Sequence, residues 1–144
     1  MRWVTREKAR VDRIACPWLI QRFLDPGAEF LFVPEAEVME TARREGAIPF
    51  DVPGVELGHH GDHCSFDAFL EKYRIEDPAL RALALIVRGA DTEARDIAGE
   101  AWGLYAVASG FRLISRDDHE NMARQFPVYD ALYAYCRDRL AQGR

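Results

Sequence analysis

The sequence predicts an α+β fold of one domain, with short strands in the N-terminal third and a helical C-terminal half. Compact apolar and aromatic runs bounded by Gly and Pro occupy the first part of the chain, as expected for buried strands. Turn-forming residues dominate positions 53–64, and apolar residues recur at helical spacing from residue 65 onward. No repeat, low-complexity tract or linker divides the 144 residues, so we expect a single domain over residues 1–144.

The N-terminal half alternates between predicted strands and helices. We expect strands over residues 3–5, 29–33 and 48–52, and helices over residues 14–24 and 35–45. The first helix is expected to end at Asp25, Pro26 and Gly27, and the second at Gly46. Pro49 cannot donate a ladder hydrogen bond, so the third strand is expected at an edge of the sheet.

The C-terminal half is predicted to contain helices over residues 66–73, 80–87, 97–111 and 117–140. Pro78 precedes the second of these and suits a first helical turn, where its missing N–H costs nothing. Pro127 lies inside the last helix, and we therefore expect an interruption at that position.

Composition and charge exclude several classes of protein. With 49% hydrophobic positions and 11% aromatic residues, the chain can bury enough apolar surface to exclude intrinsic disorder. Its 24 acidic residues outnumber its 19 basic ones, which gives a formal net charge of -5. Such a chain lacks the diffuse positive field with which proteins coat nucleic acids, so that role is disfavoured.

The 3 cysteines are an odd number and too few for a disulfide scaffold, which favours a reducing compartment. The charged N-terminal segment has no apolar signal region, and no later stretch approaches the length of a membrane span. We therefore expect a soluble, cytoplasmic protein without membrane contact.

Histidines mark the segment most suited to metal binding, because all but one of the 4 lie within residues 59–63. Imidazole and carboxylate groups are donors that Zn²⁺ and Fe²⁺ accept. The chain has no CxxC pair for a closed zinc site, so we predict an open divalent-metal site formed by His59, Asp91 and His119. In the alternative interpretation, these histidines are exposed loop residues that hold no metal.

Two further kinds of functional residue are suggested by position. Cys64 directly precedes a predicted helix, whose dipole would favour a thiolate, so Cys64 is the first candidate for a reactive thiol and Cys16 the second. The alternative is that both thiols are buried and inert. Arg13, which follows Asp12, and Arg88, which lies near Asp91, are candidate anion ligands because a guanidinium group matches an oxyanion. The alternative, which is the more common situation for such pairs, is a structural ion pair.

Five segments, in the same order along the chain, resemble one known family. They are residues 12–20 (DRIACPWLI), 49–51 (PFD) with 54–57 (GVEL), 59–66 (HHGDHCSF), 86–92 (IVRGADT) and 129–133 (YDALY). The chain is similar to the chromate-resistance protein family, specifically its ChrB-type C-terminal domain, over nearly its whole length. The resemblance implies a role in chromate resistance or sensing.

In that family the domain often follows an N-terminal segment held responsible for DNA binding, and it also occurs alone or beside a rhodanese-like domain. This sequence contains only the shared domain, so direct DNA binding is not expected without an additional one. Chromate is a tetrahedral dianion, and its recognition would use Arg groups or helix N-termini.

Three hypotheses follow for the function, and the sequence leaves open whether any reaction is catalysed. The first is a chromate-sensing or chromate-handling domain that binds a divalent metal or an oxyanion. The second is a metal-dependent enzyme for a small substrate, with Asp91 or His63 as acid or base. The third is a non-catalytic regulatory module that forms a homo-oligomer through a helix over residues 129–140.

Overall fold

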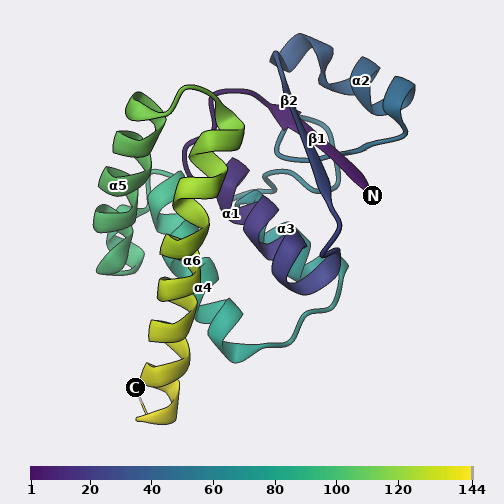
Figure 1. Cartoon of the computed structure of the whole chain (residues 1–144). Coiled ribbons are helices and arrows are strands. Elements are labelled where there is room, and N and C mark those ends of the chain that lie inside the picture. The colour runs from purple at the N-terminus through teal and green to yellow at the C-terminus, as the bar shows by residue number, and fades with distance from the viewer. Residues whose placement is uncertain (144) are drawn as a thin grey trace.

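The computed structural model describes residues 1–143 and confirms the α+β class, with a small sheet in the N-terminal part and a helical C-terminal half. Figure 1 shows the sheet at one side of the molecule and α5 at the other. The strands are β1 (Arg2–Arg6), β2 (Glu29–Val33) and β3 (Ile48–Pro49), and the helices are α1 (Asp12–Leu19), α2 (Val38–Glu45), α3 (Ser65–Lys72), α4 (Pro78–Asp91), α5 (Glu100–Ile114) and α6 (Asp118–Ala141).

The sheet is parallel and has the strand order β2-β1-β3. The chain passes from β1 through α1 to β2 and returns through α2 to β3, on the other side of β1. As Pro49 predicts, β3 lies at an edge of the sheet. All strands therefore end at the same edge of the sheet. The strand order reverses between β1 and β3, because β2 is added on one side of β1 and β3 on the other.

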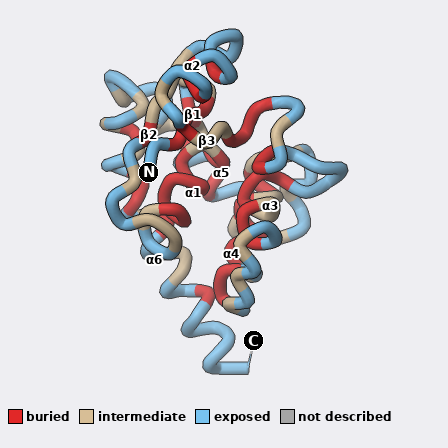
Figure 2. The backbone as a smooth tube through the Cα atoms, turned by 90° about the vertical axis from the view of Figure 1, so that its right-hand side faces the viewer, coloured by how far each residue is buried: buried red, intermediate tan, exposed pale blue. Residues whose placement is uncertain are grey.

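Alternating side chains of β1 pack on opposite faces of the sheet. Trp3 belongs to the main core cluster, which also contains buried residues of α1, α3 and α4. Val4 belongs to a smaller cluster with Val38 and Ala42 of α2. Figure 2 shows the corresponding buried positions along α1, α3 and α4. The sheet is thus covered by helices on both faces, as parallel sheets usually are.

Helix α6 joins the two halves of the molecule, because it packs against α1, α4 and α5. Trp18 of α1 donates a hydrogen bond of 2.7 Å to Asp130 of α6, and Tyr129 beside it is fully buried. Tyr133 donates to Asp77 at the start of α4. The sequence analysis considered self-association through residues 129–140. Tyr129 and Tyr133, at the start of that segment, pack within the chain instead.

The structure corrects several of the expected elements. Strand β3 ends at Pro49 rather than residue 52, and α5 covers Glu100–Ile114 rather than 97–111. Helix α1 begins at Asp12 rather than residue 14, because Asp91 accepts a hydrogen bond from its first N–H group, and a π-helix over Ile20–Leu24 continues it. Helix α4 runs from Pro78 to Asp91, beyond both ends of the expected range 80–87. Helix α6 passes through Pro127 without interruption, with Phe126 and Tyr129 buried on either side of the proline. Among residues 1–143, no helix is both long enough and apolar enough to span a membrane.

Candidate metal centre

Four side chains from separate parts of the chain meet at one point of the structure. Asp12, Asp51, His59 and Asp91 each offer one ligand atom, and these atoms all lie within 4.8 Å of one another. We call these four residues the acidic group. Asp12 starts α1, Asp51 follows β3, His59 lies in the loop before α3, and Asp91 ends α4. Such convergence of residues far apart in sequence requires the whole fold.

The sheet topology explains where this group lies. Asp12 follows β1 and Asp51 follows β3, so both are beyond the carboxyl ends of the two strands between which the strand order reverses. Loops diverge at such a point and leave a crevice, which is where open parallel sheets commonly bind ligands.

Two of the carboxylates also hold helix N-termini in place. The carboxylate of Asp12 accepts hydrogen bonds from the N–H groups of Ser65 (2.6 Å) and Phe66 (3.1 Å) at the start of α3. Asp91 accepts one of 3.2 Å from the N–H of Asp12 at the start of α1. These bonds satisfy helix-terminal donors and place negative charge where the helix dipole favours it.

Asp51 is held by side chains rather than by a helix end. Its carboxylate accepts a hydrogen bond of 2.6 Å from the Ser65 hydroxyl and lies 3.4 Å from guanidinium nitrogens of both Arg6 and Arg13. Its backbone has a φ of 53°, a left-handed conformation that is uncommon outside glycine. The carboxylate orientation is therefore fixed by contacts on several sides.

His59 contacts all three carboxylates. Its Nε2 atom lies 3.0 Å from Asp91, 3.2 Å from Asp51 and 3.5 Å from Asp12. Asp12 and Asp51 are buried, whereas the His59 side chain is 42% exposed. A small cavity of about 180 Å³ lies on this side of the group, lined by Arg6, Asp51, Val52, Pro53 and His59. The group is therefore enclosed by protein except on the side of His59.

The protonation of the group reflects its burial and charge. Burial, together with repulsion from Asp91, raises the pKa of Asp12 to about 7. Burial also raises the pKa of Asp91. Burial alone would raise the pKa of Asp51 too, but hydrogen bonds from His59 and Ser65 outweigh it and the pKa is lowered. Hydrogen bonds to the three carboxylates raise the pKa of His59 to about 12, so a protonated imidazole supplies positive charge to the group.

The structure brings together two of the three metal ligands that the sequence suggested. His59 and Asp91 are in contact, whereas His119 packs edge-on against Phe32, with ring centroids 5.3 Å apart, and is not a member of the group. His60 and His63 pair through their backbones in the loop and are also outside it. The positions that complete the group are Asp12 and Asp51.

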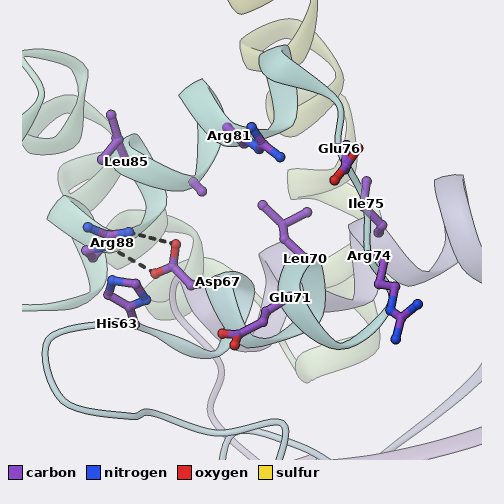
Figure 3. A pocket seen from close by; sticks show the side chains of 11 residues that line it. His63, Asp67, Leu70, Glu71, Arg74, Ile75, Glu76, Arg81, Leu85 and Arg88 are labelled. Atoms are coloured by element: carbon purple, nitrogen blue, oxygen red, sulfur yellow. Dashed lines mark hydrogen bonds and ion pairs between the residues drawn. The ribbon is translucent and has the colours of Figure 1, made fainter.

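The two arginines suggested as anion ligands are both paired with carboxylates. Arg13 contacts Asp51 and donates to the carbonyl oxygens of Arg6 (3.2 Å) and Glu7 (2.8 Å). Arg88 makes two hydrogen bonds, of 3.0 and 2.9 Å, to Asp67. Figure 3 shows this pair beside His63, at one end of a groove between α3 and α4. Of the two, only Arg13 contacts a member of the acidic group.

The environment of the candidate reactive thiols favours their neutral form. Cys16 and Cys64 are fully buried, and burial followed by repulsion from Asp12 raises the pKa of both. The Cys16 thiol donates to Asp12 (3.5 Å), and the Cys64 thiol donates to Asp67 (3.3 Å). Burial and the nearby carboxylates thus oppose the helix dipole at Cys64, which by itself would favour a thiolate.

Sequence reasoning placed Asp12 beside Arg13 as an ion pair or anion pocket and did not consider Asp51 as a ligand. In the structure Arg13 pairs with Asp51 instead. A usable signal was present: Asp51 lies near the end of the strand expected over residues 48–52, and Asp12 lies two residues before the helix expected over residues 14–24. Parallel pairing of the strands, which would bring both positions to one edge, could not be derived from the sequence.

Comparisons with known proteins show the family to which this chain belongs. Residues 3–136 match the family model described as "ChrB, C-terminal domain". The chain is 34% identical over 134 residues to "Protein ChrB" of Cupriavidus metallidurans, an alignment that covers 92% of this chain and 40% of the relative. The chain therefore spans about two fifths of that relative's length. No solved structure matches it significantly. The family match covers nearly the whole chain, and this protein belongs to the family of ChrB C-terminal domains.

Proposed function

We propose that this domain binds a divalent transition metal through Asp12, Asp51, His59 and Asp91, and that it acts in chromate resistance or sensing. The observation that carries the metal proposal is the convergence of four ligand atoms within 4.8 Å at the carboxyl edge of the sheet. Family membership supports the connection with chromate resistance.

The charge of the group supports a cation. Three carboxylates share one imidazole, and burial disfavours their negative charge. A buried carboxylate cluster is stable only when positive charge or hydrogen bonds compensate it. A divalent cation would supply more positive charge than protonated His59 does, and its binding would release the imidazole proton so that the nitrogen becomes a donor.

The donor set indicates the kind of metal. One imidazole nitrogen with three carboxylate oxygens suits Fe²⁺, Mn²⁺ or Zn²⁺ and does not suit soft ions such as Cu⁺. The thiols of Cys16 and Cys64 lie close to Asp12, but their raised pKa values count against them as ligands. The domain is therefore proposed to use an oxygen-rich site rather than a cysteine site.

The open side of the group offers a place for chromate. The three carboxylates would repel a dianion from the metal-free group. A bound metal would reverse that preference, and the cavity beside His59, lined in part by Arg6, would admit a small oxyanion to the metal. Arg13 contacts Asp51 and would orient the Asp51 carboxylate as a metal ligand. We therefore propose that metal binding precedes chromate binding.

Metal analysis tests the first step. The untagged protein is stripped with a chelator and titrated with Mn²⁺, Zn²⁺ and, without oxygen, Fe²⁺, with binding followed by calorimetry and elemental analysis. We expect one metal per chain, and a loss of affinity of at least about 100-fold in both His59→Ala and Asp91→Asn. His119→Ala is the matched control, because His119 lies outside the group, and it should bind like the unmodified chain. Absence of binding, or equal loss in all three variants, contradicts the proposal.

Anion binding tests the second step. Chromate is titrated into the metal-free and the Zn²⁺-loaded protein, with sulfate as the matched tetrahedral dianion. We expect chromate to bind only the loaded form. Equal binding to both forms would show that the anion uses another site.

A metal-dependent enzyme is the second candidate, and the open side of the group favours it. Substitution with Co²⁺ distinguishes an open from a closed site, because the visible spectrum changes when an added anion or substrate enters the coordination sphere. A spectrum that no small ligand alters would indicate closed coordination and would count against catalysis.

A further inference from the structure

The outer face of α5 exposes more apolar surface than a solvent-facing helix requires. The exposed fractions of these residues are 55% for Trp102, 42% for Val107, 84% for Leu113 and 65% for Ile114. Together these residues leave a patch on the order of 400 Å², comparable with the largest patch on a typical monomer. In Figure 1 this helix lies on the side of the molecule away from the sheet.

Small residues form the centre of the same face. Gly103 and Gly110 lie on either side of Ala106, and a Cβ atom at either glycine would meet nothing within 4 Å. Nothing inside the described chain therefore requires a glycine at these positions, although glycine destabilises a helix interior relative to alanine. Small residues between larger ones allow a second helix to approach closely.

An apolar groove lies at the other end of the helix from its most exposed residues. Ile97 and Gly99, just before α5, line a cavity of about 340 Å³ together with Leu85 of α4 and Leu140 of α6. Leu85, Ile97 and Leu140 are themselves 43%, 44% and 42% exposed. Leu113 and Ile114 protrude at the end of α5. A protruding apolar end and an apolar groove thus lie at opposite ends of one helix.

We propose that two copies of this domain associate through α5, packed antiparallel about a two-fold axis near Ala106. This arrangement places Leu113 and Ile114 of each copy at the groove of the other. It also brings Gly103 of one helix opposite Gly110 of its partner, so that small residues meet where the helices cross. Both contacts occur twice, which is the property of a two-fold interface.

The area agrees with a stable dimer. Two such patches contribute about 800 Å² of apolar surface. Because apolar atoms make up somewhat over half of an ordinary interface, an interface that covers both patches would bury about 1,400 Å² in total, which lies within the range of specific interfaces. None of the acidic-group residues belongs to α5. The proposal therefore does not depend on metal binding.

Sedimentation of the full chain over a range of concentrations tests the association. We expect twice the mass of one chain at micromolar concentrations and a dissociation constant raised at least about 100-fold by Gly110→Glu, because two carboxylates would be buried at the crossing. The new side chain has free space in the single copy, so circular dichroism should show an unchanged fold. Met39→Glu, at a 48% exposed position on α2, is the control and should associate normally. A monomer at 100 µM, or a dimer unaffected by Gly110→Glu, overturns the proposal.

Cysteine cross-linking tests the orientation. The native cysteines of the described chain are buried, so Gly103→Cys and Gly110→Cys each add one accessible thiol. When the two variants are mixed and oxidised, antiparallel packing predicts a disulfide between position 103 of one copy and position 110 of the other. Cross-links only between identical positions would show parallel packing and contradict the arrangement.

Discussion

The acidic group and the outer face of α5 depart from ordinary folding preferences in opposite directions. Around Asp12 and Asp51 the protein buries charged groups, whereas on α5 it exposes Trp102 and Leu113. Exposed polar groups and buried apolar groups need no special explanation. Buried charges and exposed apolar patches indicate function, because each costs stability unless something compensates it. The compensation at the acidic group is visible within the chain, as hydrogen bonds and His59. On α5 no compensation is visible among residues 1–143.

The largest expected effect comes from removing the Asp12 carboxylate. Asp12→Ala should lower the free energy of unfolding of the metal-free protein by about 3 kcal/mol, because α3 loses its cap and buried N–H groups lose their partners. Asp12→Asn keeps one acceptor and should lose less. Urea unfolding measures both variants. A loss below about 1 kcal/mol for Asp12→Ala would mean that the carboxylate is not needed for folding.

Metal addition sharpens the same side of the comparison. If the group binds a cation only in the folded state, free metal at about 100 times its dissociation constant should stabilise the domain by about 2.7 kcal/mol. The increment should disappear in His59→Ala and persist in His119→Ala. Thermal unfolding with and without Zn²⁺ or Mn²⁺ provides the measurement, and an identical increment in both variants would exclude His59 as a ligand.

Two glycines test the inner and outer faces of α5 directly. A Cβ atom at Gly89 of α4 would lie 2.7 Å from the Cβ of Ala101, so Gly89→Ala should destabilise the domain by about 2 kcal/mol. Gly103→Ala has free space and should stabilise the single chain by about 0.5–1 kcal/mol through helix propensity. Chemical unfolding of dilute protein measures both. Destabilisation by Gly103→Ala would show a packing role that the structure lacks.

The smallest expected effect is an absence of thiol reactivity. Cys16, Cys64 and Cys136 are buried, and burial raises the pKa of each. A thiol reagent added to the native protein near pH 7 should therefore modify none of them within minutes, and all of them after unfolding. Rapid modification of Cys64 would instead support the helix-dipole argument made from the sequence.

Much of the fold could be predicted from local sequence, and the site only in part. Residues 29–33 form a strand as expected, and Pro49 correctly marks an edge, because these properties depend on neighbouring residues. The continuity of α6 through Pro127 could not be predicted, since packing of the residues around the proline decides it. Asp91 was predicted as a partner of His59, but Asp12 and Asp51 were missed, because only the parallel pairing of β1 with β3 brings Asp51 towards Asp12.

The dispersion of the four acidic-group residues between positions 12 and 91 has a consequence for folding kinetics. Contacts between distant segments form after local ones, because closing long loops costs chain entropy. The group would be assembled only when the sheet, α1 and α4 are already together. A metal would then arrive late and slow unfolding, instead of nucleating the fold as zinc does in small finger domains.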